Sequence, residues 1–174
     1  MAKDQNPMQA IRISKLVINI GTGNEERHTD AAKKLITLIT SRTPVDELSR
    51  KRNPSFKITK GQKIGAMVTV RGEEIKKLLP RLLDATDNRI KDSSITPNSL
   101  SFGIKEYIDI RGIKYDPAIG MLGMNVNLSF RRMGARVEYR KRGAARIPDH
   151  HRIIDRDAIK SFMEKEFGVN VAEG

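Results

Sequence analysis

Residues 15–39, KLVINIGTGNEERHTDAAKKLITLI, place Gly21 and Gly23 between an apolar run and an amphipathic run. A glycine turn before a helix can hold a phosphate, because the free N–H groups at a helix N-terminus attract anions. The dinucleotide-binding pattern needs a further glycine where this chain has Glu26, and the Gly-Lys-Ser/Thr sequence of a phosphate loop is absent. Glu25 and Glu26 also occupy the place of the anion. We therefore expect a strand-to-helix turn and no nucleotide cofactor.

No pattern in the sequence indicates a metal site or catalysis. His150 and His151 lie beside Asp149, but neighbouring side chains on regular structure point apart and the remaining histidine, His28, is far away in sequence. Nearby arginines would repel a cation. Cysteine is absent, which excludes thiolate ligands, and no nucleophile elbow or other catalytic spacing occurs. We expect neither a metal nor an enzyme.

The basic residues are concentrated in two segments. The chain has 33 Lys and Arg against 21 Asp and Glu, a net charge of +12. Residues 50–63 hold six basic residues and no acid, and residues 131–152 hold eight basic residues and two acids, so these segments carry the whole excess, 6 + (8 − 2) = 12. Such regional charge indicates a polyanionic partner rather than a generally solvated surface.

Hydrophobic periodicity predicts the elements that would carry this charge. Alternation predicts strands at residues 11–21, 100–104 and 124–130, and one-sided apolar spacing predicts helices after the glycine turn, at 72–87 and at 155–168. Pro80 should kink or break the second helix. Asp155 and Gly168 are the expected caps of the third.

The segments between these elements are predicted as turns and hairpins. Residues 44–55 are expected to form a loop that enters a hairpin over 56–72, with Gly61 at its tip and Gly65 at a bulge or close approach. Residues 131–142 are expected to form a second hairpin about Gly134, with Val137 and Tyr139 inward. Residues 109–123 are expected to form a structured loop.

Helices separated by hairpin-connected strands predict an α+β fold, a twisted antiparallel sheet with helices packed on one face. We expect one domain over residues 1–174, with 1–8 and 169–174 flexible. No apolar run is long enough for a membrane span and the N-terminus lacks a signal peptide, so a cytoplasmic protein with no membrane partner is expected.

The basic segments favour RNA held by its backbone and shape. Lys and Arg supply affinity through phosphate contacts, whereas specificity requires polar groups that reach bases or 2′-hydroxyls. Asn19 and Thr69 are candidates for specific contacts, since each lies on a strand at a step that faces away from the core; ordinary solvation is the alternative. The aromatic spacing of the stacking type of RNA-binding sheet is absent.

Three segments together closely resemble the L-five family of large-subunit ribosomal proteins, in its archaeal and eukaryotic form. They are KLVINIGTG, FKITKGQKIGAMVTVRG and SFGIKEYIDIRGIKYDPAIGMLGMNVNLSFRRMGARVEYRKR. The resemblance runs from about residue 8 to residue 168. It implies a non-enzymatic protein that binds 5S ribosomal RNA and helps to seat it in the central protuberance, beside 23S-type RNA and neighbouring ribosomal proteins.

The resemblance also implies site residues. Family members contact 5S RNA at positions that match Asn19, Arg42 and Thr69, and the charge pattern adds Arg71, Arg131, Arg136 and Arg140. A hairpin that reaches the P-site transfer RNA corresponds to Thr59, Lys60, Gly61, Gln62 and Lys63. A loop that meets a protein of the small-subunit head corresponds to residues 112–120, including Gly112, Lys114, Tyr115 and Asp116.

The chain departs from the family pattern at three places. Arg42 stands where relatives carry a glutamine, and because arginine only donates hydrogen bonds, its contact should shift toward phosphate or a base acceptor. Pro80 and the RRMGARV segment also differ, which affects local geometry. The rival hypotheses are a nucleic-acid-binding module outside the ribosome that acts by charge alone, and a nucleotide-using enzyme, which would need a phosphate site that the glycine turn does not supply.

Overall fold

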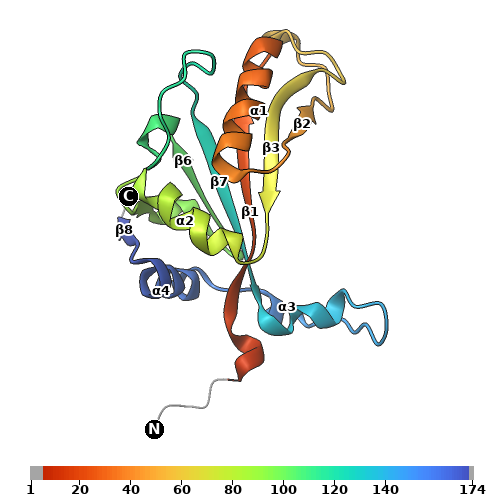
Figure 1. The fold of residues 1–174 in the computed structure, drawn as a ribbon. Coiled ribbons are helices and arrows are strands. Elements are labelled where there is room, and N and C mark those ends of the chain that lie inside the picture. The colour runs from red at the N-terminus through yellow and green to blue at the C-terminus, as the bar shows by residue number, and fades with distance from the viewer. Residues whose placement is uncertain (1–5, 173–174) are drawn as a thin grey trace.

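The computed structural model describes residues 6–172 and contains one large antiparallel sheet with helices beside it (Figure 1). Its six strands lie in the order β2-β3-β1-β7-β6-β5. Their bounds are β1 Ile11–Gly21, β2 Val45–Leu48, β3 Lys63–Val70, β5 Ile95–Thr96, β6 Ser99–Ile104 and β7 Met124–Arg132. Two short strands, β4 (Arg89–Lys91) and β8 (Asn170–Ala172), pair in parallel and form a separate sheet.

The helices cover one face of the large sheet. They are α1 (Glu26–Thr40), α2 (Glu74–Asp84) and α4 (Arg156–Phe167), and a short α3 (Asp149–Arg152) precedes α4. Short 3₁₀ turns lie at Pro7–Gln9, Pro54–Phe56, Asp92–Ser94, Tyr107–Asp109 and Met133–Glu138. This arrangement confirms the predicted α+β class with helices on one side of an antiparallel sheet.

The alternation of apolar residues determines which face of the sheet is buried. Leu16 pairs with Val70 on one side and Leu128 on the other, and all three are at most 1% exposed. Paired residues share a face, so each inward row adds one layer beneath the helices. The aromatic ring of Phe130 packs edge-on against Phe162 of α4, with centroids 5.9 Å apart, and closes this core at one end.

The structure shows where α1 ends and that α2 continues through Pro80. α1 ends at Thr40, with Ser41 in the left-handed region at φ 53° and its N–H donating to the carbonyl of Thr37. α2 is not broken at Pro80 but continues to Asp84. The buried face of α2 carries four leucines and an isoleucine, and this packing outweighs the backbone hydrogen bond that proline removes.

The structure corrects the two predicted hairpins. Residues 45–48 form edge strand β2, which pairs with β3, so the hairpin joins β2 to β3 and residues 49–62 are its long loop. The second hairpin is absent: Met133–Glu138 form a 3₁₀ turn, and Tyr139 is exposed rather than inward. Local alternation was a poor guide there, because β7 is already paired with β1 on one side and β6 on the other, which leaves it no free edge for a returning hairpin strand.

The C-terminal part is tied to the body of the protein. Asp155 precedes α4 in extended geometry, as predicted for a cap, although its side chain accepts no capping hydrogen bond, and Gly168 closes the helix at φ 63°. β8 then pairs with β4. Residues 1–8 and 169–174 were predicted to be flexible, and of these, residues 1–5 and 173–174 lie outside the described residues. Within residues 6–172, no helix combines the length and the apolar character needed to cross a bilayer.

Candidate nucleic-acid interface

The face of the sheet that the helices leave open is polar and free of acidic residues across its four central strands. β1, β3, β6 and β7 contain no Asp or Glu. Their outward positions carry mainly amides, hydroxyls and small residues, with a few basic residues toward one end. The outward polar side chains are Arg12, Lys15, Asn19, Thr69, Ser99, Ser101, Asn125, Asn127, Ser129 and Arg131.

Asn19 lies on the central strand β1 of this open face, two residues before the strand ends at Gly21. Its Cα partners are Met67 on β3 and Asn125 on β7. The side-chain oxygen Oδ1 is buried and accepts no hydrogen bond from the described residues. Because a buried acceptor without a partner is unfavourable, a ligand that donates a hydrogen bond here would gain from an oxygen that the fold leaves unsatisfied.

Three glycines form the floor of the depression beside Asn19. Gly21, Gly103 and Gly123 line it together with Lys105 and Asn125. The shortage of side chains would let a ligand approach the backbone closely. Gly123 is itself held close, since a Cβ atom there would lie 2.8 Å from the carbonyl oxygen of Lys105.

Arg42 and Thr69, two of the residues predicted to contact 5S RNA, lie at the side of the sheet. Both line a depression between the end of α1 and strands β2 and β3. The Arg42 guanidinium is held by Glu74 at the start of α2, with Nε and Nη2 lying 2.8 and 2.7 Å from Oε2 of that carboxylate. Five N–H donors are carried by a guanidinium, so this pairing fixes its orientation and still leaves donors for RNA.

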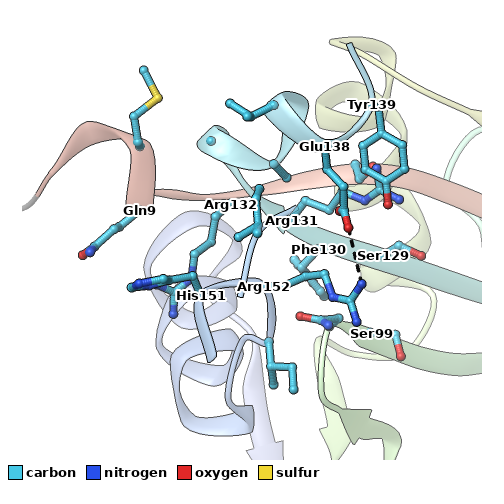
Figure 2. Close-up of a pocket in the computed structure, with 18 of the residues that line it drawn as sticks. Gln9, Ser99, Ser129, Phe130, Arg131, Arg132, Glu138, Tyr139, His151 and Arg152 are labelled. Carbon is cyan, nitrogen blue, oxygen red and sulfur yellow. Dashed lines mark ion pairs between the residues drawn. The ribbon is translucent and has the colours of Figure 1, made fainter. Parts of the chain in front are cut away.

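The predicted arginines beyond the sheet differ in how firmly they are placed. Arg71 is exposed at the end of β3. The guanidinium of Arg131 stacks over the ring of Tyr139, 4.7 Å from its centroid (Figure 2). Arg140 is turned back on its own loop, because its Nε donates to the carbonyl of Gly143 at 2.6 Å. Arg136 lies exposed on the 3₁₀ turn between them.

The tip of the β2–β3 loop is internally braced. Gly61 adopts φ 85°, and its N–H donates to the carbonyl of Ser49 at 2.8 Å. The Gln62 side chain accepts the N–H of Thr59 at 2.9 Å and donates to the side chain of Asn24. Lys60 is exposed at this tip. The loop therefore presents its lysine on a defined turn rather than on a free strand.

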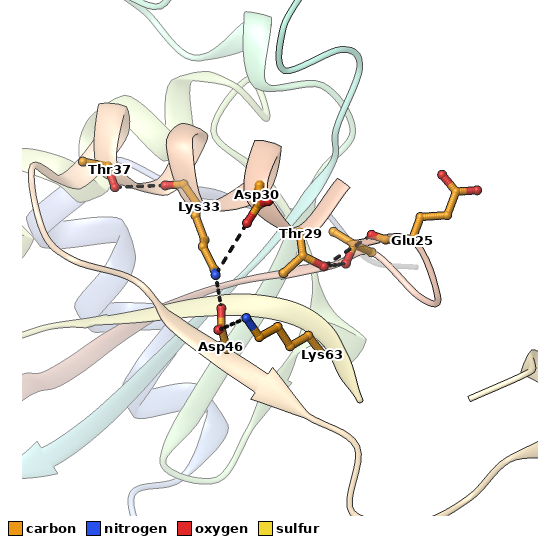
Figure 3. A network of polar contacts seen from close by, with 8 residues as sticks. Glu25, Thr29, Asp30, Lys33, Thr37, Asp46 and Lys63 are labelled. Atoms are coloured by element: carbon orange, nitrogen blue, oxygen red, sulfur yellow. Dashed lines mark hydrogen bonds and ion pairs between the residues drawn. The ribbon is translucent and has the colours of Figure 1, made fainter. Parts of the chain in front are cut away.

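Lys63, the last predicted residue of this loop, belongs to an ion-pair network instead (Figure 3). Asp46 on β2 lies 2.6 Å from Nζ of Lys33 on α1 and 3.2 Å from Nζ of Lys63. Pairing with Lys33 lowers the pKa of Asp46, and pairing with Asp46 raises the pKa of Lys33. Lys33 and Asp46 thus stay charged near neutral pH, and the ion pairs of Asp46 fasten the base of the loop to α1.

The predicted contact loop at residues 112–120 is held by a hydrogen bond to the buried side chain of Tyr107. The fully buried Tyr107 accepts the N–H of Asp116 through its hydroxyl at 3.0 Å. The Asp116 carboxylate accepts the N–H of Ala118 at 2.9 Å, so this residue shapes the loop. Tyr115, 53% exposed, and Lys114 are presented outward, and Gly112 turns the chain at φ 88°.

The predicted residues form separate groups. The 49–62 loop and the 105–123 loop lie at one end of the sheet, and the basic segment that follows β7 lies at the other (Figure 1). β1 has 11 residues and runs between these ends, a length of roughly 35 Å at the usual rise per residue of a strand. Asn19, Arg42 and Thr69 lie between, on or beside the open face.

The geometry suits binding and gives no sign of catalysis. Contrary to expectation, the rings of His150 and His151 lie together, with centroids 4.2 Å apart. Even so, no cluster of three or more His, Cys, Asp or Glu able to hold a metal occurs in the part of the chain that the structure describes.

The glycine turn between β1 and α1 is held by a side-chain contact. Thr22 and Thr29 share a 2.8 Å hydrogen bond there, which ties the strand to the helix.

Sequence reasoning missed several residues of this interface. Asn125, Asn127 and Ser101 belong to the open face, and their alternation with buried residues was the available signal. Glu74 and Asp46 orient Arg42 and the loop base from distant elements, and nothing in the local sequence indicates these pairings. Tyr139 was assigned to the core and instead stacks on Arg131.

Comparisons with known proteins agree with this geometry. Residues 6–59 match the family described as Ribosomal protein L5, and residues 63–161 match the C-terminus of the same ribosomal family. The large ribosomal subunit protein uL5 of Sulfurisphaera tokodaii is 37% identical over 177 residues, covering 100% of both chains. The uL5 protein of Methanobrevibacter smithii is 39% identical and the match covers 95% of this chain and 97% of the relative. That of Nanoarchaeum equitans is 38% identical, with 96% of this chain and 99% of the relative covered. The chain therefore belongs to the ribosomal L5 family and is a non-enzymatic structural constituent of the large ribosomal subunit, where its partners are ribosomal RNA and ribosomal proteins.

Proposed function

We propose that the chain binds 5S ribosomal RNA on the open face of its sheet and helps to seat it in the central protuberance. In this proposal Asn19 and Thr69 supply specific contacts, Arg42 contacts a phosphate or a base acceptor, and Arg71 and Arg131 neutralise phosphates. Arg136 and Arg140 add charge beside the sheet. The bound RNA lies on the face opposite to the helices.

The observation that supports this proposal most strongly is that the four central strands of the open face carry no acid, while basic segments lie beyond its ends. Phosphate groups would meet no carboxylate on β1, β3, β6 or β7. Amide and hydroxyl groups can both donate and accept hydrogen bonds with bases and 2′-hydroxyls. A surface built for non-specific attraction would instead concentrate its Lys and Arg at the centre.

The two loops at one end of the sheet support the remaining contacts of the proposal. We assign the 49–62 loop, through Thr59, Lys60, Gly61 and Gln62, to the P-site transfer RNA. We assign the 112–120 loop, through Lys114 and Tyr115, to a protein of the small-subunit head. Both loops are braced at their bases and exposed at their tips, which suits contacts that must be exchanged as the subunits move.

The test of the 5S assignment compares two RNAs of equal length, 5S ribosomal RNA and an unrelated RNA, across a salt series. We expect the 5S complex to be tighter by several kcal/mol, with part of this preference retained at high salt, because hydrogen bonds to bases do not release counterions. The measurement is the dissociation constant by filter binding or fluorescence anisotropy. If both RNAs bind alike and weaken together, the chain binds RNA by charge alone.

Lys60→Ala tests the transfer RNA assignment. The substitution is expected to weaken transfer RNA binding to subunits reconstituted with the variant by severalfold, since one phosphate contact is lost. The 5S affinity should stay within about twofold, because Lys60 lies at the end of the sheet opposite to the basic segment that follows β7. It does not share partners with the sheet face, so its effect should be independent of the 5S contacts. Lys165→Ala, on the exposed side of α4, removes the same charge far from the loop and should change neither. Equal losses for transfer RNA and 5S RNA would refute this division of roles.

A further inference from the structure

A cavity of about 710 Å³ lies at one end of the open face, where β7 passes into the 3₁₀ turn Met133–Glu138 (Figure 2), and four outward residues of that face help to line it: Lys15, Ser99, Ser129 and Arg131. Its walls come from the N-terminal segment, the start of β1, the β5–β6 turn, the end of β7 and the chain around α3. None of the residues assigned above to 5S or transfer RNA, apart from Arg131, lines it. Its volume falls in the range of about 300–1,000 Å³ that is usual for ligand pockets.

The walls of the cavity are fixed by backbone and side-chain hydrogen bonds. Asn98 in the β5–β6 turn accepts the N–H of Ile154 through Oδ1 at 2.8 Å, and its carbonyl accepts the N–H of Phe130 at 2.8 Å. The N–H of Met133 donates to the carbonyl of Ala10 at 3.0 Å and holds the N-terminal wall. The cavity is therefore preformed, so a ligand would not have to order the walls before binding.

The lining combines an apolar body with a cationic rim. Apolar surface comes from Met8, Phe130, Val137, Ile147 and Ile153. Positive charge comes from Lys15, Arg131, Arg132 and Arg152, against the single carboxylate of Glu138. That carboxylate lies 3.5 Å from Nη1 of Arg152 (Figure 2), and Nη2 of Arg152 lies 2.9 Å from Oδ1 of Asp149, so Arg152 is itself paired and the net positive charge of the rim comes from Lys15, Arg131 and Arg132.

Two features point to a flat ligand that carries an anion. The Arg131 guanidinium stacked on Tyr139 provides a planar surface at the rim, and nucleobases stack on aromatic rings and on guanidinium planes. Nε of Arg132 is buried and finds no hydrogen-bond acceptor among residues 6–172. A phosphate or base oxygen would satisfy it, which an apolar ligand could not do.

We propose that this cavity is a socket for one unpaired nucleotide of RNA, with its base entering the apolar body against the Arg131–Tyr139 pair and its phosphate on Lys15 and Arg132. The hydroxyls of Ser99 and Ser129 and the carboxylate of Glu138 line the same cavity and could read the polar edge of the base. The inference rests on the proposed function only in taking RNA as the partner. It assigns a single-stranded contact at one end of the face that would hold folded 5S RNA.

The test uses a 12-nucleotide single-stranded RNA of mixed sequence and a blunt-ended RNA duplex of the same sequence, which has no unpaired nucleotide, titrated against the full chain by fluorescence anisotropy. Tyr139→Ala should weaken single-stranded binding by about tenfold, the loss typical of one base–aromatic stack. Tyr139→Phe should restore it. Val137→Trp, which fills the cavity, should weaken it at least as much. Because none of these three substitutions changes a charge, none of them should alter the binding of duplex RNA or the salt slope.

Arg142→Ala is the matched control, since Arg142 lies exposed in the same basic segment but does not line the cavity. It should weaken both RNAs alike and lower the salt slope by about one. In addition, RNA containing 4-thiouridine should crosslink to residues 131–153 of the wild-type chain and not of Val137→Trp. Melting curves establish that each variant folds; if Val137→Trp does not, Tyr139→Ala decides, because its side chain is 62% exposed.

Unchanged single-stranded binding by folded Tyr139→Ala and Val137→Trp would overturn the socket. Variants that bind RNA normally yet fail to assemble into the large subunit would also overturn it, because they would indicate a protein occupant of the cavity. The two proposals can fail separately. Variants without effect beside an intact 5S preference would refute the socket alone. Loss of single-stranded binding in a chain with no 5S preference would support the socket and refute the 5S assignment.

Discussion

Replacement of Asn19 by alanine is expected to weaken 5S RNA binding by roughly 1–3 kcal/mol, about 5- to 150-fold, while the free protein keeps its stability. The two effects separate because Oδ1 of Asn19 is buried and has no hydrogen-bond donor from the described residues. In the free protein the substitution removes an unsatisfied acceptor, so stability should be unchanged or slightly higher. In the complex it leaves the RNA donor without its partner.

The measurement pairs 5S affinity at two salt concentrations with a thermal melt of the free protein. Binding to unrelated RNA should hardly change, since Asn19 carries no charge. Asn170→Ala is the control, because it removes an exposed amide from β8, away from the large sheet. Asn19→Asp adds a charge that repels phosphate and should bind 5S RNA more weakly than alanine does. A fall in melting temperature that accounts for the lost affinity would show that Asn19 acts on the fold.

The elements that could be predicted are those whose burial is one-sided and local. β1 and β7 alternate, so Leu16 and Val126 could be assigned to the core and Asn19 and Asn127 to the other face without knowledge of the partners. The same reasoning predicts α1 and α2. Pro80 was given too much weight, because the predicted break neglected the energy of the buried face around it.

The elements that could not be predicted depend on partners distant in sequence. β2 is four residues long and its exposed edge gives no apolar alternation; it is a strand because β3 offers hydrogen bonds. Residues 133–138 alternate like a strand, yet they form a 3₁₀ turn, because both edges of β7 are occupied by β1 and β6 and no hairpin strand can return along it.

The candidate site divides in the same way. Outward polar positions such as Asn19 and Thr69 follow from the period of a strand, and the resemblance added Arg42. The bond from Arg42 to Glu74, the pairing of Lys63 with Asp46 and the stacking of Arg131 on Tyr139 join residues by the fold alone. Local sequence shows which side chains can bind, but their orientation is determined by contacts that only the structure reveals.

Gly65→Ala is expected to destabilise the protein by roughly 1–3 kcal/mol, the usual range for overpacking. A Cβ atom at Gly65 would lie 2.5 Å from the carbonyl oxygen of Ile20. That oxygen belongs to the backbone of β1 and cannot rotate away as a side chain could. Relief therefore requires β1 and β3 to separate beside the pair Asn19 and Met67. Thermal unfolding should show a loss of about 2–4 °C per kcal/mol for a chain of this length.

Gly21→Ala provides the matched control, because Gly21 is the direct partner of Gly65 in the β1–β3 ladder and a Cβ atom there would meet nothing within 4 Å. Its stability should change by no more than about 0.5 kcal/mol, as at an ordinary surface position. Gly65→Val, which adds two further methyl groups at the same point, should be worse than Gly65→Ala. If Gly65→Ala and Gly21→Ala melt alike, close approach of the strands does not require the glycine. If only the Gly65 variants lose both stability and 5S affinity, the tight β1–β3 contact is what holds Asn19 and Thr69 at the spacing that RNA recognition would need.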